Sequence, residues 1–323
     1  MNEENSVKKP RFSYTALSTF KTCGLQFAYK YQHRLREDSS ALNLGLGNIA
    51  HKVKELIGRD LMDGIKPDYE RYKAIMMDGY TGVDKASGQT ETIPGCNELR
   101  NQFFEDWIAP DTKSGMTYEQ KIQIFFDHLS DDENDTEWTV CGTEIPFEVE
   151  YGDVILFGFI DKLSVNGKGE LKITDYKTSK KIFEGTDIKT PLQMLVYDIA
   201  VRQLYPDMPI VAHTYDFVFL GVTQEGGSPG WMARGEKKLD TLLAQIASCR
   251  ESDVWKPCPS PLCAWCDYSP TNPKAPKALM NKCPYHSLWT PDDKRYEVAQ
   301  KWDDKTSEAI LKQADAPKTK FWF

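Results

Sequence analysis

The sequence lacks any long hydrophobic run. Its longest strongly apolar stretch, residues 154–160, is far shorter than the roughly 20 residues needed to cross a bilayer. The first residues contain no apolar core of a secretion signal. These two absences argue against a membrane protein and against a secreted one, so we expect a cytoplasmic protein, in the host cytoplasm if the gene is viral.

An excess of positive charge is also lacking, since 40 Lys and Arg residues face 48 Asp and Glu residues, a formal net charge of −8. Such a balance argues against a nucleic-acid partner unless the basic residues are clustered. Residues 7–36 contain basic residues and no acid, and four lysines lie within residues 172–181. These two tracks are compatible with DNA bound through its phosphates, although solvated surface charges would give the same pattern.

No nucleotide-binding loop of the form G-x-x-x-x-G-K-[ST] is present, which excludes the usual helicase motor. What is present fits an ordinary globular protein: 40% hydrophobic and 27% charged residues, in a chain long enough for one elaborated domain or two. In a cytoplasmic chain the eight cysteines are expected to be thiols or metal ligands rather than disulfides.

A predicted β-hairpin organises the chain. Residues 154–160 form an apolar strand that ends at Asp161, residues 170–178 form an alternating strand, and the Asn-Gly-Lys-Gly turn between them tolerates positive φ. Because side chains two apart on a strand share a face, Asp175 and Lys177 point the same way, with Asp161 brought beside them. Two carboxylates at one edge form a hard-oxygen site for Mg²⁺ or Mn²⁺, where the ammonium can position a water.

The triplet D-x-K is weak by itself, because solvated Asp–Lys pairs on a surface hairpin look the same. Further along, Thr190 as N-cap and Pro191 as first helical residue predict a helix over residues 192–204. Gln193 and Tyr197, four apart, share one face of that helix. The hairpin and this helix together form a more specific pattern than either alone.

In this order the motifs resemble those of RecB-like nucleases of the PD-(D/E)XK superfamily, G-x-x-D, then D-Y-K-T, then Q-x-x-x-Y. The resemblance implies an α/β fold whose mixed central sheet is flanked by helices. It also implies a metal held by Asp161 and Asp175 and completed by the main-chain carbonyl of Tyr176. The implied roles of the others are orientation of water by Lys177, and support of the site or contact with the DNA backbone by Gln193 and Tyr197.

The same family places a metal-binding histidine on a helix with the pattern G-x-x-x-H, which Gly47 and His51 match. The resemblance therefore implies His51 as a further ligand, better suited to Mn²⁺ than to Mg²⁺. Relatives also carry a glutamate near the strand that precedes the hairpin, here expected over residues 143–151. Glu148 or Glu150 is the candidate for that position, and an exposed polar strand face is the alternative.

Four cysteines follow within 26 residues: Cys258, Cys263, Cys266 and Cys283. A C-x-x-C segment turns two thiolates onto one metal centre, so one interpretation is a local zinc site made of these four, or with His286 in place of Cys283.

The other interpretation follows from the resemblance, because the family joins a C-x-x-C-x-Y segment and a later cysteine to a distant N-terminal cysteine around a four-iron four-sulfur (4Fe–4S) cluster. The implied ligands are Cys23, Cys263, Cys266 and Cys283. The extra Cys258 and the long insertion after Cys266 depart from the family pattern.

The expected organisation has five segments: an N-terminal helical segment with the cluster cysteine and the metal histidine (1–66), a helical cover (67–140), a nuclease core (141–250), a Cys-rich cluster segment (251–290), and a C-terminal helix and tail (291–323). Further expectations are one helix over about 14–35, helices over 97–108 and 118–129, a loop over 87–95, and a strand over 209–222.

The resemblance implies a metal-dependent deoxyribonuclease, similar to the CRISPR-adaptation, AddB-type and phage nucleases of this branch. It would act as a stand-alone exonuclease on single-stranded DNA or DNA ends in repair, recombination or phage DNA metabolism. Its expected partners are a separate helicase, a recombinase, or a CRISPR or phage replication protein. The alternative is a non-catalytic DNA-binding protein with a structural zinc site.

Overall fold

The computed structural model describes residues 8–35, 41–83, 88–111 and 114–285. The chain divides into two compact units, one of residues 1–14 and 40–239 and the other of residues 15–39 and 240–323. The boundary falls within helix α11 (Trp231–Ser252). The finer five-segment organisation stays a prediction, and its last segment, 291–323, lies outside the described residues.

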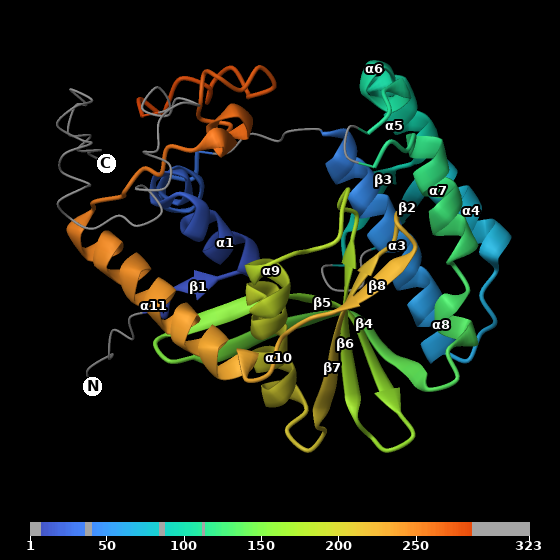
Figure 1. Ribbon diagram of the computed structural model, residues 1–323. Coiled ribbons are helices and arrows are strands. Elements are labelled where there is room, and N and C mark those ends of the chain that lie inside the picture. Colours follow the sequence, from blue (N-terminus) through green and yellow to red (C-terminus); the bar gives the residue numbers. More distant parts are fainter. Residues whose placement is uncertain (1–7, 36–40, 84–87, 112–113, 286–323) are drawn as a thin grey trace. The chain divides into compact units, whose positions relative to one another are not determined.

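The first unit is built on a six-stranded mixed sheet with the order β1-β5-β6-β7-β8, with β4 paired to β5 (Figure 1). β4, β5 and β6 are antiparallel neighbours joined by short turns, whereas β6 and β7 are parallel and need a crossover, which contains α9 (Thr186–Lys189) and α10 (Leu192–Leu204). The expected mixed central sheet flanked by helices is confirmed. The strands are β1 (Arg11–Phe12), β4 (Trp138–Tyr151), β5 (Val154–Asn166), β6 (Leu171–Lys177), β7 (Ile210–Phe217) and β8 (Val222–Glu225).

Strand β5 changes its neighbour along its length. On the side away from β4, its first residues pair with β1 at Ile155 and Leu156, and its last residues pair with β6 from Lys162 to Val165. In the described part of the chain, the residues between Leu156 and Lys162 pair with neither β1 nor β6. The sheet is therefore split on that side of β5, and side chains at the split are free to serve a site.

Helices cover both faces of the sheet (Figure 1). α10 lies on one face, and the long helix α3 leads a group on the other. In α3 the buried residues Leu46, Ile49, Val53 and Ile57 recur every three or four positions, so one stripe faces the core. The group comprises α3 (Leu42–Met62), α4 (Tyr69–Asp78), α5 (Cys96–Gln102), α6 (Phe104–Ile108), α7 (Tyr118–Asp127) and α8 (Asp131–Asn134).

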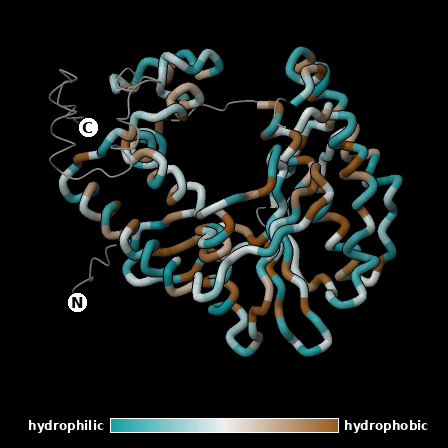
Figure 2. The backbone as a smooth tube through the Cα atoms, viewed as in Figure 1, coloured by the Kyte–Doolittle hydropathy of each residue, from teal (hydrophilic) through white to brown (hydrophobic). Residues whose placement is uncertain are grey.

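Hydrophobic positions recur along the strands and along α3, while the turns at the lower end of the sheet are hydrophilic (Figure 2). The main apolar cluster lies among α3, α4, α5 and α7, and Tyr176 of β6 joins it with Val218 and Phe219. Burial of apolar surface on this scale is the dominant stabilising term of the fold. In the described part of the chain, no helix has both the length and the apolar character needed to span a bilayer.

The loop expected over residues 87–95 is wrong in part, because β3 (Thr90–Pro94) pairs antiparallel with β2 (Gly79–Val83). A two-stranded ribbon is marginal alone. This one is held by α3, where the ammonium of Lys52 lies 2.5 Å from a carboxylate oxygen of Glu91, and by Ile93, which packs on the apolar cluster. These contacts are remote in sequence, so local pattern did not reveal the strand.

Other boundaries also differ from expectation. α10 has the expected bounds, but its N-cap is Pro191, with extended backbone (φ −75°, ψ 115°), and Thr190 lies before it. The strand expected over 209–222 is two, since β7 ends at Phe217 and a turn with Gly221 at φ 63° leads into β8. The helix expected over 97–108 is interrupted at Phe103, between α5 and α6.

The second unit joins the N-terminal helices to the Cys-rich segment. The single helix expected over 14–35 is interrupted at Cys23, whose extended backbone (φ −161°) separates α1 from α2. The Tyr29 hydroxyl donates to the Lys282 carbonyl at 2.8 Å, and the Tyr268 hydroxyl donates to the Leu35 carbonyl at 2.6 Å. The elements are α1 (Tyr14–Thr22), α2 (Gly24–Phe27), a π-helical turn η1 (Ala28–Gln32) and a 3₁₀ turn η2 (Pro261–Trp265).

Candidate active site

Two neighbouring strands bring the expected carboxylates together at the split in the sheet. β5 and β6 pair as far as Lys162 and Thr174, and the next step of this register sets Asp161 opposite Asp175. Opposite residues of an antiparallel pair project to the same side. Both side chains are buried, with exposed fractions of 6% for Asp161 and 1% for Asp175. The structure therefore brings together the two carboxylates that the hairpin motif singled out.

A third carboxylate, Glu144, comes from β4. A bulge at Cys141 shifts the β4–β5 register, and Glu144 itself adopts φ 45°, which is uncommon for a residue with a side chain. The backbone around Glu144 thus leaves regular strand geometry, and its carboxylate lies within 4.8 Å of a carboxylate oxygen of Asp161. Strained backbone of this kind is typical of functional sites.

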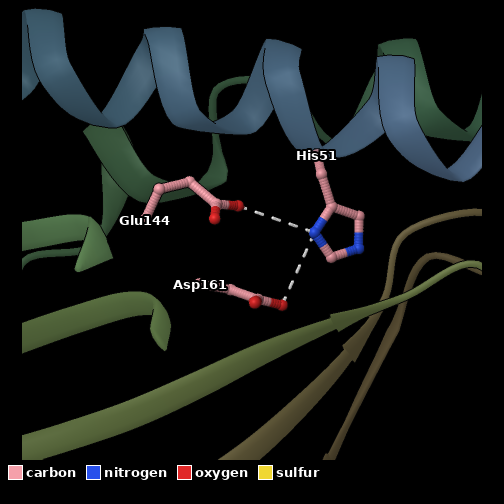
Figure 3. Close-up of side chains that lie close together, drawn as sticks. All are labelled: His51, Glu144 and Asp161. Atoms are coloured by element: carbon pink, nitrogen blue, oxygen red, sulfur yellow. Dashed lines mark ion pairs between the residues drawn. The ribbon is translucent and has the colours of Figure 1, made fainter. Parts of the chain in front are cut away.

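His51 completes the group from helix α3 (Figure 3). Its Nδ1 lies 3.8 Å from Oε1 of Glu144 and 3.6 Å from Oδ2 of Asp161. The close approach of helix and strand has a steric basis in Gly47, one turn before His51, since a Cβ there would lie 3.3 Å from the hydroxyl oxygen of Thr178. The structure places the expected Gly47–His51 pair at the carboxylates.

The backbone of Tyr176 holds Asp161 in place, because its N–H donates to Oδ2 of Asp161 at 2.8 Å. The buried Tyr176 ring lies near two ammonium groups, 5.4 Å from that of Lys54 and 5.6 Å from that of Lys162. Both lysines pair with the carboxylate of Asp132. The Tyr176 ring is thus packed against a fixed charged cluster, which helps to hold the residue that carries this N–H.

Lys177 is held between the sheet and α10. Its Nζ lies 2.6 Å from Oδ2 of Asp175 and donates to Oε1 of Gln193 at 2.6 Å. The Gln193 amide nitrogen donates in turn to the Tyr197 hydroxyl at 3.0 Å. The two α10 residues lie four apart, on one face of the helix, as the sequence indicated. All four side chains thus form one connected row.

The pKa values of three groups in the site, Asp175, Asp161 and His51, are raised. Burial, with the charge of Asp161 adding to it, raises the pKa of Asp175 to about 7. Burial also raises the pKa of Asp161. For His51, burial acts to lower the pKa, but the hydrogen bond with Glu144 and the negative charges of Asp161, Glu144 and Asp175 raise it to about 9. A divalent cation at this place would therefore displace protons when it binds.

His51, Asp161 and Asp175 line one cleft of about 460 Å³ that is open to solvent. Asp161, Asp175 and Lys177 thus face a common cleft, as expected for side chains brought together at one edge of the hairpin. The described lining is Asn43, His51, Asp161, Asp175, Tyr176, Lys177, Thr178, Ser179, Lys180 and Gln193.

The donor set fits a divalent cation. Oδ1 of Asp175 is buried and accepts no hydrogen bond within the part of the chain that the structure describes. A buried carboxylate oxygen without a partner costs free energy unless a cation neutralises it. Carboxylate oxygens with one imidazole suit Mn²⁺, and the oxygens alone suit Mg²⁺.

Glu148 and Glu150 are wrong as candidates for the strand glutamate. Oε2 of Glu148 lies 2.6 Å from a guanidinium nitrogen of Arg11, and Oε2 of Glu150 lies 2.7 Å from the ammonium of Lys9. Both glutamates are exposed. The alternative of an exposed polar strand face is therefore the correct one for these two residues.

Glu144 was missed, although a signal for it exists in the sequence. The turn at Gly152 and Asp153 joins β4 to β5 with Tyr151 opposite Val154. Counting back from that turn sets Glu144 opposite Asp161. The alternation of the strand over 143–151, taken without its pairing to the hairpin, does not reveal this relation.

The cysteines gather in a separate pocket of the second unit, lined by Cys23, Cys258, Cys263, Cys266 and Cys283. None of them is in a disulfide. The Cys258 N–H donates to the Cys23 sulfur at 3.3 Å, although the two residues are 235 positions apart. The N-terminal cysteine thus shares a pocket with the C-terminal ones, while His286 lies outside the described residues.

Backbone N–H groups are directed at four of these sulfurs. The Ser260 N–H donates to Sγ of Cys263 at 3.4 Å, and backbone hydrogen bonds from Tyr268 and Tyr285 act on the thiols of Cys266 and Cys283. Burial raises the pKa of each of these two thiols to about 12, and the hydrogen bonds oppose that rise. Such N–H donors are typical around sulfurs that carry negative charge as metal ligands.

Comparison with known proteins gives one family. The family model described as the PD-(D/E)XK nuclease superfamily matches residues 11–271, which include His51, Glu144, Asp161, Asp175 and Lys177. A comparison with curated proteins gives no significant match.

Proposed function

The chain belongs to the PD-(D/E)XK nuclease superfamily, and on that premise we propose that it hydrolyses DNA phosphodiester bonds with Mg²⁺ or Mn²⁺, as an exonuclease acting on single strands or ends. The observation that carries the proposal is the convergence of Asp161, Asp175 and Lys177 with His51 in one cleft. Asp and Lys side chains that merely form solvated surface pairs would not be buried together in this way.

The cation would be held by Asp161, Asp175, Glu144 and His51, with the carbonyl of Tyr176 as a further ligand. When bound, such a cation lowers the pKa of its water and neutralises charge that develops on the phosphorus. The Tyr176 N–H holds the carboxylate of Asp161 in a fixed orientation. Asp161 therefore needs to reorient less when the cation binds.

Lys177 is the proposed catalytic residue. An ammonium group has three N–H donors; that of Lys177 donates to Gln193 at 2.6 Å and forms an ion pair with Asp175, also at 2.6 Å. The group still has an N–H to offer to the attacking water or to a phosphoryl oxygen, where a compact positive charge stabilises the transition state. Gln193 is a positioning residue, held by the Tyr197 hydroxyl.

The cysteine pocket supports a 4Fe–4S cluster held by Cys23, Cys263, Cys266 and Cys283. Among the described residues, no three cysteine sulfurs lie within 4.8 Å of one another. A single zinc ion would hold its sulfurs roughly 3.8 Å apart, given Zn–S bonds of about 2.3 Å. The wider spacing favours a larger inorganic core, with a structural role in tying residues 15–35 to the Cys-rich segment.

A separate helicase, a recombinase, or a CRISPR or phage replication protein is the proposed partner, because the sequence contains no nucleotide-binding loop of its own. Membership of the superfamily implies a nucleic-acid substrate, and DNA rather than RNA is our proposal. The rival function, a non-catalytic DNA-binding protein with zinc in the cysteine pocket, makes different predictions in the following test.

The test is digestion of end-labelled single- and double-stranded DNA with Mn²⁺, with Mg²⁺ and with chelator. We expect metal-dependent release of short products from the ends, lost in Lys177→Met and kept in Lys168→Met, which removes an exposed lysine from the β5–β6 turn. Cleavage that needs no metal, or equal activity in both variants, would refute the proposal. DNA retention without cleavage under all conditions would favour the rival.

A further inference from the structure

The cleft extends past the proposed metal ligands to Asn43 at the start of α3 and to Lys180 after β6. Neither residue has a part in the hydrolysis proposed above. Asn43 is exposed and Lys180 is half-buried, and both belong to one network of contacts that runs through α7. The N–H donors and the positive charge of that network indicate which kind of ligand the extended part of the cleft binds.

The Asn43 amide is oriented by Tyr118 of α7. The Tyr118 hydroxyl donates to Oδ1 of Asn43 at 3.0 Å. The amide oxygen of Asn43 is therefore bound by Tyr118, and the NH₂ group points away from Tyr118. Nδ2 of Asn43 donates to no group within the described part of the chain, and the side chain lines the cleft. Asn43 therefore offers two N–H donors to a ligand in the cleft.

Lys180 is oriented by a buried carboxylate. Its Nζ lies 3.1 Å from Oδ2 of Asp111, and the Nζ of Lys121 lies 2.8 Å from the same oxygen. The Asp111 and Lys121 side chains are 3% and 6% exposed, whereas that of Lys180 is 40% exposed. One carboxylate thus faces two ammonium groups, so the group carries a net positive charge, which reaches solvent at Lys180.

The two arms of this network are rigidly connected. Tyr118 and Lys121 lie on one face of α7, and the Lys121 ammonium lies 5.0 Å from the centre of the Tyr118 ring. Tyr118 also stacks on Trp107, with ring centroids 5.3 Å apart and planes at 28°. Buried packing of this kind fixes Asn43 and Lys180 on one wall of the cleft before any ligand binds.

We propose that Asn43 and Lys180 form a second phosphate-binding subsite, which holds the phosphate that neighbours the scissile one in a nucleic-acid strand. A neutral N–H donor pair beside an ammonium is suited to phosphate oxygens and carries no sequence information. This inference rests on the proposed function. It predicts that the best small substrates carry two phosphates, one at the metal ligands and one at the subsite.

The experiment compares thymidine substrates that differ by one terminal phosphate. TpT has a single internal phosphate, pTpT adds one on the 5′ side, and TpTp adds one on the 3′ side. We expect kcat/KM in Mn²⁺ to rise at least about tenfold over TpT for one of the two, since a charge-assisted phosphate contact contributes on that scale. The substrate with the higher kcat/KM shows on which side of the scissile phosphate the subsite lies. A higher kcat/KM for both substrates indicates that the subsite accepts a terminal phosphate on either side of the internal one.

The variants are Lys180→Gln and Asn43→Asp, with Lys168→Gln as a control for loss of one positive charge. Asn43→Asp keeps an oxygen for the Tyr118 hydroxyl and replaces the N–H donors with a carboxylate oxygen, which repels phosphate. We expect both variants to reduce the ratio of kcat/KM between the two-phosphate substrate and TpT at least fivefold. The control is expected to keep the wild-type ratio.

Equal kcat/KM for TpT, pTpT and TpTp, or a gain that survives in both variants, would overturn the subsite. If the wild-type protein hydrolyses none of the substrates, the proposed function fails, and binding decides the inference separately. For that case, fluorescently labelled pTpT and TpTp are titrated in chelator. Weaker binding in both variants than in Lys168→Gln supports the subsite, and equal binding refutes it.

Discussion

The N–H of Tyr176 donates a 2.8 Å hydrogen bond to Oδ2 of Asp161, one residue beyond the point where β5 and β6 stop pairing. In a continuing ladder that N–H would bond to a carbonyl of β5. Here the strands separate and a side chain accepts the bond. The end of the hairpin thereby becomes the place where carboxylates, Lys177 and His51 meet.

Replacement of Glu144 tests whether the missed carboxylate is a metal ligand. Glu144→Gln keeps the shape and removes the charge, so we expect the affinity for Mn²⁺, measured by calorimetry, to fall at least about tenfold. Glu148→Gln is the matched control on the same strand, since Glu148 is exposed beside Arg11. Equal affinities in the two variants would remove Glu144 from the metal site.

Metal binding is expected to depend on pH. Protons occupy Asp175, with its pKa of about 7, and His51, with its pKa of about 9, so a cation must displace them. The apparent Mn²⁺ affinity should rise from pH 6 to pH 9, by up to roughly tenfold per pH unit for each proton displaced. An affinity that is constant over this range, measured in non-coordinating buffers, would contradict the assignment of these ligands.

The stability of the metal-free protein should change with pH in the opposite direction. Both pKa values are raised on folding, from 3.8 for Asp175 and 6.5 for His51. Between each ordinary value and the raised one, the folded state binds more protons than the unfolded state, so its stability falls as pH rises. The Tm should therefore fall between pH 5 and pH 9, and added Mn²⁺ should raise it most at the alkaline end.

Substitutions of single cysteines distinguish an iron–sulfur cluster from a zinc ion in the cysteine pocket. The cluster proposal uses Cys23 and leaves Cys258 unligated, whereas the local zinc interpretation uses Cys258 and leaves Cys23 out. We expect Cys23→Ser to lose bound iron and the broad absorbance near about 400 nm, and Cys258→Ser to keep both. A colourless protein that contains zinc and loses it in Cys258→Ser would establish the zinc interpretation instead.

The contacts that join Lys177, Gln193 and Tyr197 predict that a substitution at Gln193 lowers kcat and leaves the Mn²⁺ affinity nearly unchanged. Gln193→Ala removes the carbonyl that holds the Lys177 ammonium, so kcat should fall about tenfold while Mn²⁺ affinity stays within twofold. Gln203→Ala is the control on the same helix, because Gln203 donates to the carbonyl of Glu150, away from the cleft. A loss of Mn²⁺ affinity in Gln193→Ala would show that Gln193 acts on the metal ligands.

The buried pairs beneath the site predict a large loss of stability. Asp132→Ala removes the carboxylate that pairs with Lys54 and Lys162, and leaving two buried ammonium groups without it should cost about 3–5 kcal/mol of unfolding free energy. Asp135→Ala, which breaks the more exposed pair with Lys172, should cost about 1 kcal/mol or less. Denaturant unfolding of both variants measures the difference.

Much of the nuclease core can be predicted from the sequence. Alternation with a Gly-containing turn identified the β5–β6 hairpin, helical spacing identified α10, and the order of the motifs indicated the superfamily that the family model matches. These features follow from local periodicity and steric limits, which the sequence carries directly.

Features that depend on pairing between distant segments are visible in the folded chain and not in the sequence pattern. The bulge at Cys141 and the turn of Glu144 depend on β4 lying against β5, and β3 is a strand because α3 holds it. The wall of Asn43 and Lys180 depends on contacts through α7. Such positions are set by long-range packing and by charges that must find partners once they are buried, and no local pattern of residues records either.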